Sequence, residues 1–206
     1  AGAAGFWQIL KKTGQEYDLE VNNDVDERYN VVEATNAAAH YLKDAYDIFG
    51  SWTLAAASYN MGMGGVNKQL KRQKVKTYYD LLLNSETSRY VFRILAAKEI
   101  HENPTKYGFH YREKDLYQVP QTYSITVDTT VSDLAYFAEL NKVNYKILKI
   151  FNPWMRQSYL PNKTRKKYTV LFPKSGYYDF SSTELPTPLD SSSSAVDTLQ
   201  VEEIDE

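Results

Sequence analysis

The side chains that could do chemistry lie at three separated places in the first half of the sequence. Gln8 follows Gly-Phe-Trp, Tyr59 and Asn60 lie just before the glycines of MGMGG, and Tyr90 lies within SETSRY. Tyrosine is abundant, with 18 Tyr against 8 Phe, and its flat ring with a polar tip suits surfaces that hold sugars or bases. Taken singly, Tyr59 could equally be a core tyrosine, Asn60 a helix C-cap and Tyr90 a residue of an amphipathic face.

Other catalytic groups are poorly represented. The three histidines, His40, His101 and His110, are scattered and there is no cysteine, so the sequence predicts no metal site. No G-x-S-x-G elbow is present, and MGMGG follows a predicted helix, which is the wrong context for a phosphate loop. We therefore expect neither a metal nor a cofactor.

The elements that would position these groups are mostly helices. In TNAAAHYLKDAYDIFG, apolar residues recur at three- and four-residue offsets, which predicts a helix capped by Thr35 or Asn36 and ended by Gly50. Ser51 should cap a second helix, WTLAAASYN, which is apolar on every side and therefore buried. Short helices are predicted in VNKQLKRQ and TYYDLLL.

A longer helix is predicted from Ser85, with Ser85 as its cap and Pro104 as its stop. Its apolar face would hold Val91, Ile94 and Leu95.

The second half predicts a small α+β module. QTYSITV and KKYTVLF alternate as strands do, and two short helices lie between them, one capped by Ser132 and the other by Asn144. The order strand, helix, helix, strand spans roughly 60 residues, near the lower limit for independent folding.

Composition separates the last 26 residues from the rest. Residues 181–206 hold seven acids and no Lys or Arg, which predicts a disordered acidic tail or a linker. Residues 1–180 then carry 24 Lys and Arg against 19 acids, a charge of about +5 that suits an anionic partner. No stretch is long and apolar enough to span a bilayer.

Three long stretches carry a family resemblance: AGAAGFWQIL, the run DVDERYN to MGMGGV, and ETSRYVF to KYGF. Between residue 1 and about residue 109 they resemble the membrane-bound lytic murein transglycosylase D group of the soluble lytic transglycosylase and goose-type lysozyme superfamily. SDLAYFAELNKVNYKILKIFNP, within 120–173, is similar to LysM and LysM-like modules, which bind glycans containing N-acetylglucosamine.

The resemblance implies three parts. Residues 1–112 would form a mainly α lysozyme-like domain lacking its first helix, residues 113–180 a small α+β LysM-like module, and residues 181–206 the acidic Ser-rich tail or linker. Such a protein would be a periplasmic or cell-envelope enzyme of cell-wall turnover, associated with the outer membrane in some forms and without a cofactor. Its partners would be peptidoglycan glycan strands, with envelope association through an N-terminal anchor outside this sequence, and it would be a monomer that binds no nucleic acid.

The resemblance also assigns substrate-binding residues. Gln8 matches the Gln of the family's G-L-W/M-Q motif, with Phe6 in place of Leu. Tyr59 and Asn60 match the A-Y-N-x-G motif, with Ser for Ala before them. Tyr90 matches the Tyr of E-T-x-x-Y.

The family's single catalytic Glu lies in an upstream E-S-x-F motif, so it would precede Ala1 and the chain would hold no catalytic residue. Family members protonate the bond between N-acetylmuramic acid and N-acetylglucosamine and release a 1,6-anhydromuramyl product, which makes them lyases. Glu27 and Glu86 are the carboxylates that could substitute, but Glu27 belongs to a conformational motif and Glu86 to the first turn of a helix, where a negative charge is favourable. We therefore expect little or no turnover by this chain.

Two other functions remain open. A non-catalytic peptidoglycan-binding protein would use the same residues without cleavage. A nucleic-acid binder would use the basic segments 68–76 and 162–167, but basic runs are more often solvated faces or contacts with anionic polymers.

Overall fold

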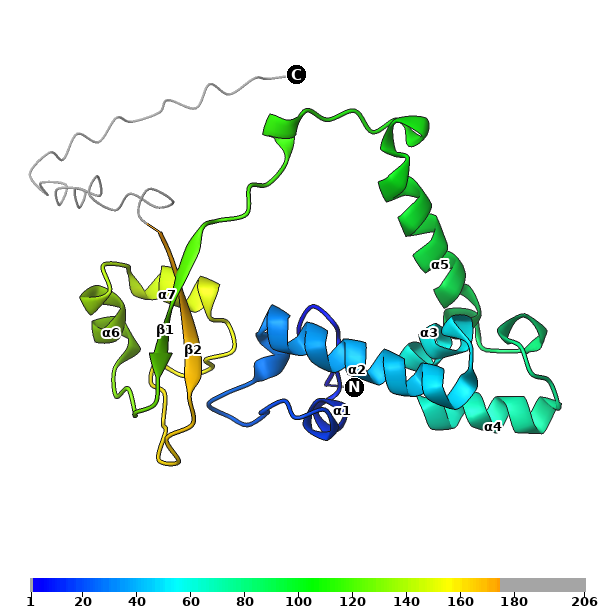
Figure 1. Cartoon of the computed structure of the whole chain (residues 1–206), viewed down its shortest axis with the longest axis horizontal. Coiled ribbons are helices and arrows are strands. Elements are labelled where there is room, and N and C mark those ends of the chain that lie inside the picture. The colour runs from blue at the N-terminus through cyan, green and yellow to red at the C-terminus, as the bar shows by residue number, and fades with distance from the viewer. Residues whose placement is uncertain (1, 175–206) are drawn as a thin grey trace, which may run out of the picture.

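The computed structural model describes residues 2–174, so the predicted tail at 181–206 lies outside the described residues. The first part of the chain is helical (Figure 1). Its elements are α1 (Lys11–Glu16), η1 (Glu27–Tyr29), α2 (Val31–Phe49), α3 (Trp52–Met61), α4 (Met63–Gln73), η2 (Tyr78–Asp80) and α5 (Ser85–Glu102), where η is a 3-10 helix. Within residues 2–174 we find no helix with the length and apolarity that crossing a bilayer requires.

The end of α2 was predicted correctly, but its start was not. Gly50 ends the helix in the left-handed region, at a φ of 62°. The predicted cap at Thr35 or Asn36 is wrong because Asn30 accepts hydrogen bonds from the backbone N–H groups of Val32 and Glu33. The helix therefore starts five or six residues earlier, at Val31 and Val32, which are exposed and lie outside the repeating apolar pattern.

Three other helix predictions need correction. The glycines of MGMGG form a break of one residue at Gly62, because Gly64 and Gly65 already lie in α4. Segment 77–83 contains only the turn η2. Asn84, and not Ser85, caps α5 by accepting from the Thr87 N–H.

Helix α3 lies at the centre of the helical part, where it packs against α2, α4 and α5. Its alanines allow these neighbours to approach closely, and the surrounding core contains Leu54, Ala57, Val66, Tyr78, Leu81 and Val91. The prediction that α3 is buried on every side fails at Trp52, which is 59% exposed and stacks on Tyr46 of α2. The predicted apolar face of α5 holds only at Val91, since Ile94 and Leu95 are exposed.

The second part has the predicted order of elements. Strands β1 (Thr122–Val127) and β2 (Tyr168–Pro173) pair antiparallel, and α6 (Leu134–Leu140) and α7 (Tyr145–Phe151) lie between them in sequence. Asn144 caps α7 as predicted. Asp133, and not Ser132, caps α6 by accepting from two backbone N–H groups.

A linker connects the two parts. It contains η3 (Pro104–Tyr107) and η4 (Glu113–Asp115) and arches away from both parts before it enters β1 (Figure 1). The parts instead meet where the segment between α1 and α2 contacts the second module. Val25 and Met155 form a backbone bridge, and Asp26 N–H donates to the Trp154 carbonyl.

Asn152 tests the packing of the second module. It is fully buried, and its side chain donates to the carbonyls of Leu148 and Leu171 and accepts from the Leu171 N–H. Asn152→Ala would remove the partner of the Leu171 N–H and carbonyl, while the Leu148 carbonyl keeps the Asn152 backbone N–H. It should lower the free energy of unfolding by about 2–4 kcal/mol in urea titrations. The control Asn103→Ala removes one exposed hydrogen bond and should change it by less than about 0.5 kcal/mol. Equal effects of the two variants would contradict this role of Asn152.

Candidate functional site

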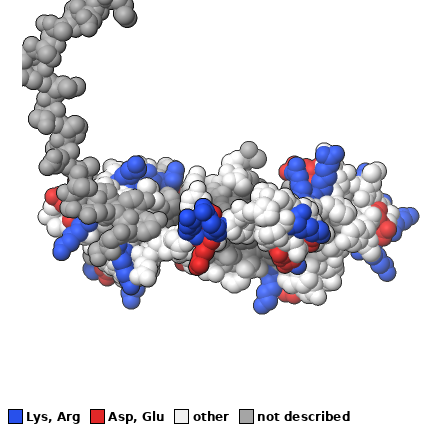
Figure 2. Space-filling view, turned by 90° about the horizontal axis from the view of Figure 1, so that it is seen from above, with Lys and Arg blue, Asp and Glu red and all other residues white. Residues whose placement is uncertain are grey.

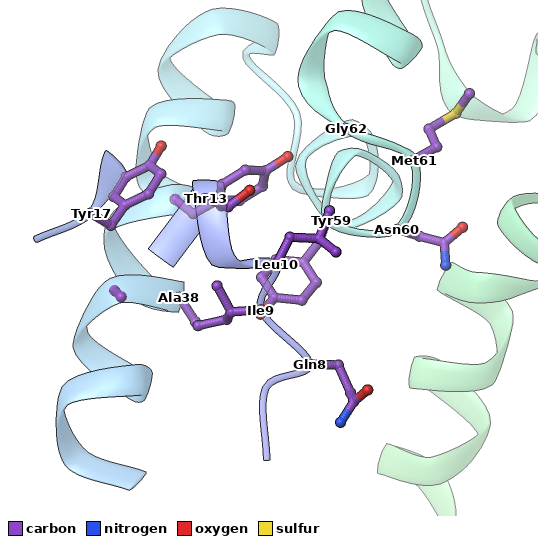
Figure 3. A pocket seen from close by; sticks show the side chains of 12 residues that line it. Gln8, Ile9, Leu10, Thr13, Tyr17, Ala38, Tyr59, Asn60, Met61 and Gly62 are labelled. Carbon is purple, nitrogen blue, oxygen red and sulfur yellow. The ribbon is translucent and has the colours of Figure 1, made fainter. Parts of the chain in front are cut away.

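A pocket of about 280 Å³ lies between the start of α1, helix α2 and the end of α3 (Figure 3). The residues that line it are Gln8, Ile9, Leu10, Thr13, Tyr17, Ala37, Ala38, Tyr41, Tyr59, Asn60, Met61 and Gly62. Its size falls just below the usual range for small-molecule sites. Three of the four predicted site residues, Gln8, Tyr59 and Asn60, are therefore brought together.

Gln8 lies in a tight turn closed by the antiparallel bridge between Ala4 and Ile9. Its backbone has a φ of 50°, and both its backbone N–H and its side-chain amide donate to the Gly5 carbonyl. The side chain is exposed and projects away from Ile9 and Leu10 (Figure 3). Its amide oxygen and second N–H can therefore reach a ligand.

Gly5 is required by the backbone that passes beside this turn. A Cβ atom at Gly5 would lie 1.8 Å from the carbonyl oxygen of Arg28, and Gly5 has a φ of +75°. Only glycine meets both conditions. The turn that presents Gln8 is thus pressed directly against the backbone at residue 28.

A buried ion pair between Asp26 and Arg28 holds the Gln8 turn in place. The Arg28 guanidinium binds both carboxylate oxygens of Asp26, at 2.9 and 2.7 Å, and both side chains are about nine-tenths buried. The same guanidinium donates to the carbonyls of Gly2 and Ile9, at 2.9 and 3.1 Å. Arg28 therefore holds the turn in place through its carbonyl and through its side chain.

Tyr59 connects α3 to the same turn. Its hydroxyl donates to the Trp7 carbonyl at 2.8 Å, and its ring lies edge-on to those of Trp7 and Tyr41. Burial, followed by the nearby Tyr90 and Tyr41, raises the pKa of Tyr59 to about 12. The phenol is therefore neutral near pH 7 and serves as a hydrogen-bond donor.

Two residues of the pocket, Tyr17 and Tyr41, were missed in the sequence. Tyr17 stacks at a tilt on Tyr41, donates to Asp44 at 2.9 Å, and has its pKa raised by burial and then by Asp44. The Tyr41 hydroxyl donates to the Ser58 carbonyl at 2.7 Å. Together with Tyr59 and Trp7 they make one row of rings. The only signal in the sequence was the high tyrosine content, which does not indicate position.

Asn60 is a helix residue and not the C-cap of α3, which is Gly62. Its side-chain oxygen accepts from the Thr87 hydroxyl at 2.7 Å, and its amide donates to Glu86 at 3.1 Å. Figure 3 shows Asn60 directed toward α5. Asn60 thus ties α3 to the first turn of α5 and leaves only part of its amide for a ligand.

Tyr90 and Glu27 are not among the residues that line the pocket. Tyr90 is partly buried on α5, and burial raises its pKa. Glu27 faces the second module. Its carboxylate accepts from the Glu20 N–H of its own segment at 2.7 Å and from Lys166 of the module at 3.0 Å. Tyr90 therefore lies beside the site and Glu27 at the junction of the two parts.

The pocket offers rings, amides and one aliphatic hydroxyl but no carboxylate, histidine or lysine among the described residues that line it. Within residues 2–174 we find no group of three or more His, Asp or Glu side chains that could hold a metal. Such a lining suits a neutral ligand rich in hydroxyl and amide groups, with apolar ring faces against the aromatic side chains. It supplies no proton donor with a pKa near neutrality.

Comparison with known proteins assigns both parts to families. Residues 1–82 match the transglycosylase SLT domain, and residues 123–176 match the soluble lytic transglycosylase C-terminal LysM-like domain. The chain therefore combines a lytic transglycosylase SLT domain with a LysM-like domain, as the resemblance in its sequence indicated.

Membrane-bound lytic murein transglycosylase D is a curated relative of the chain. The chain is homologous to this protein of Escherichia coli K12, with 32% identity over 165 residues, and to that of Escherichia coli O6:H1 strain CFT073 at the same identity. The match covers 78% of this chain and 36% of either relative, so the chain spans little more than a third of their length.

The buried ion pair generates a stability prediction. Arg28→Met leaves Asp26 buried without its partner and should lower the free energy of unfolding by about 3–5 kcal/mol. Arg112→Met breaks the exposed Arg112–Asp115 pair and should cost less than about 1 kcal/mol. Urea titrations measure both. A loss at Arg28 no larger than at Arg112 would show that the turn does not depend on this pair.

The pKa of Tyr59 generates a pH prediction. Its value of about 12 in the folded protein exceeds that of about 10 for an unfolded tyrosine. Between these values the unfolded state loses the proton first, so the free energy of unfolding should fall as the pH rises from about 10 to about 12. Tyr59→Phe should make this fall shallower, and should also cost about 1 kcal/mol at neutral pH.

Tyr117→Phe, in the exposed linker, is the control for loss of a hydroxyl. Thermal unfolding at several pH values measures the slope. An unchanged slope in Tyr59→Phe would mean that Tyr59 is not buried as the structure places it.

Proposed function

We propose that this chain is part of a peptidoglycan lytic transglycosylase and that the pocket between α1, α2 and α3 holds the glycan strand. The enzyme would cleave the bond between N-acetylmuramic acid and N-acetylglucosamine and release 1,6-anhydromuramyl products. The observation that supports the proposal most is the joining of Gln8, Tyr59 and Asn60 in one neutral, aromatic pocket of a transglycosylase SLT domain. The relatives that match this chain are named lytic murein transglycosylases, and this name states the activity of those proteins.

The lining of the pocket suggests how the residues divide the work. The rings of Tyr59, Tyr41 and Tyr17 would pack on the apolar faces of sugar rings, and the amides of Gln8 and Asn60 would bind hydroxyl and acetamido groups. Such contacts orient the glycosidic bond, and attack by the substrate's own 6-hydroxyl would need no positioned water. One carboxylic acid would then protonate the leaving oxygen and accept the proton of that hydroxyl.

We infer that this acid is contributed from outside these 206 residues. Of the two carboxylates that could replace it, Glu27 binds Lys166 away from the pocket and Glu86 accepts from Asn60 at the start of α5. The chain alone would therefore bind glycan with little or no turnover. The same observation favours the alternative, a non-catalytic peptidoglycan-binding protein.

The proposal also covers the domain boundaries of the chain, its partner, its oligomeric state and its location. Residues 1–112 would form the transglycosylase domain and residues 113–180 the LysM-like module, whose groove beside β1 and α6 includes Thr130, Asp133 and Tyr136. The partner would be peptidoglycan, the oligomeric state a monomer and the location the periplasm or cell envelope, with outer-membrane association through an anchor outside the chain. We do not propose nucleic acid as a partner, because the face of the molecule shown in Figure 2 carries basic side chains interspersed with acidic ones.

Gln8 offers the sharpest test of the pocket because its side chain is exposed and, among residues 2–174, bonds only to the Gly5 carbonyl of its own turn. Gln8→Met keeps its length and removes the amide, so affinity for a tetramer of N-acetylglucosamine should fall about tenfold, as loss of about 1.4 kcal/mol implies. Gln118→Met in the linker is the matched control and should leave the affinity unchanged. Isothermal titration calorimetry measures the affinity of the parent and of both variants for the tetramer. Equal affinities of the Gln8 variant and the parent would remove the pocket from the proposal.

Digestion of purified sacculi separates the enzyme from the binder. The 206-residue chain should bind sacculi and release no anhydromuropeptides detectable by mass spectrometry, whereas a longer product of the same gene that includes an upstream E-S motif should release them. Products from the short chain that disappear in Glu27→Gln or Glu86→Gln would refute our placement of the acid. No products from either chain, with binding retained, would favour the non-catalytic alternative.

A further inference from the structure

The segment between α1 and α2 belongs to the cores of both domains. Leu19 and Val21 pack with Ile9 of the pocket and with Ala34 and Ala37 of α2. Val25, four residues later, is only 1% exposed and lies in the core of the LysM-like module. The module's core is therefore completed by a side chain of the transglycosylase domain.

Backbone hydrogen bonds fix the register of this contact. Val25 and Met155 form an antiparallel bridge, flanked by Asp26 N–H to the Trp154 carbonyl at 2.9 Å and Arg156 N–H to the Asp24 carbonyl at 2.8 Å. These bonds act as a short piece of β-ladder between the two domains. A contact of this kind has one geometry, unlike the exposed linker that also joins the domains.

Charged groups close the junction on one side. The Lys166 ammonium lies 2.8 Å from Glu20 and 3.0 Å from Glu27, and the Tyr168 hydroxyl donates to Glu20 at 2.9 Å. Glu20 and Glu27 also bond to each other's backbone: Glu20 N–H donates to the Glu27 carboxylate and Glu27 N–H to the Glu20 carbonyl. One lysine of the module thus holds both ends of the loop that carries Val25.

The loop leads directly to the pocket. Arg28 follows Glu27, its carbonyl meets Gly5, and its guanidinium binds the Ile9 carbonyl. Ile9 and Gln8 line the pocket. A displacement of the loop therefore moves the backbone on which the Gln8 turn rests.

We propose that the LysM-like module is a structural support of the pocket and that Val25 and Lys166 are positioning residues for the Gln8 turn. The identity of the ligand rests on the proposed function, but the mechanical coupling does not. The module would then do more than add a second glycan contact: it would set the geometry of the first. Opening of the junction would weaken the pocket, and occupation of the pocket would in turn favour the closed junction.

Hydrogen exchange of the full chain tests the coupling without any ligand. The variants are Val25→Ala, which leaves a void in the module's core, and Lys166→Met, which keeps the length of the side chain and removes the charge. Lys167→Met is the matched control, since no ion pair involves Lys167 among residues 2–174. Mass spectrometry follows peptides that contain the bonded amides of Ala4 and Ile9.

Both variants should speed exchange in residues 4–9 on the order of tenfold, and the control should match the parent. Faster exchange confined to residues 20–29 and 154–168, with residues 4–9 unchanged, would overturn the proposal. Because Lys166 is partly exposed, Lys166→Met should remain folded, so a failure of Val25→Ala to fold would leave the test intact.

Glycan affinity distinguishes failure of the coupling from failure of the function. Lys166→Met should weaken binding of the N-acetylglucosamine tetramer several-fold in the parent and have a smaller effect in the Gln8→Met background, since both changes act on one turn. Full additivity would contradict the coupling. Absence of binding by the parent would refute the proposed function, while the exchange result would still decide the coupling.

Discussion

The buried pair of Asp26 and Arg28 is the constraint on which the rest of the structure depends. A guanidinium placed among apolar side chains must find a partner for its charge and acceptors for its remaining N–H groups. Asp26 supplies the first, and the carbonyls of Gly2 and Ile9 supply the second. These bonds hold the Gln8 turn, beside which the Arg28 carbonyl oxygen requires glycine at position 5, and Asn30, two residues after Arg28, caps α2. The pair lies one residue from Glu27, so the junction with the LysM-like module shares the same support.

The pocket that results is a binding surface rather than an acid–base centre. Tyr59 connects the two features that form the pocket, which are the row of aromatic rings and the Gln8 turn. Its ring packs against Tyr41 in the row, and its hydroxyl donates to the Trp7 carbonyl of the turn. Burial raises the pKa of Tyr41 and of Tyr59 above the usual value for tyrosine, so their hydroxyls donate hydrogen bonds and do not transfer protons near neutrality. Orientation of a neutral glycan and delivery of a proton are therefore tasks for different groups. This division agrees with our proposal that the residues lining the pocket do not include the catalytic acid.

Local patterns predicted several helix boundaries correctly, but they missed others and did not predict which faces are exposed. Gly50, Ser51 and Asn144 acted as the sequence indicated because each carries its own conformational or capping preference. The start of α2 was missed because Asn30 lies before two β-branched residues, outside the apolar repeat. The exposure of Trp52 and Ile94 depends on which elements pack nearby, and periodicity does not contain this information.

The site residues likewise fall into those that the sequence predicted and those that it did not. The resemblance to transglycosylases supplied Gln8, Tyr59 and Asn60, which do meet, whereas Tyr17 and Tyr41 had no motif. The junction was beyond prediction, since Val25 is a single apolar residue whose partners lie some 130 positions later.

Chemical-shift mapping by NMR of the full chain with a tetramer of N-acetylglucosamine tests the central claim most directly. We predict saturable shifts at the amides of residues 5–10 and 58–62, with a common dissociation constant. Shifts confined to the LysM-like module, with none around Gln8 and Tyr59, would contradict it.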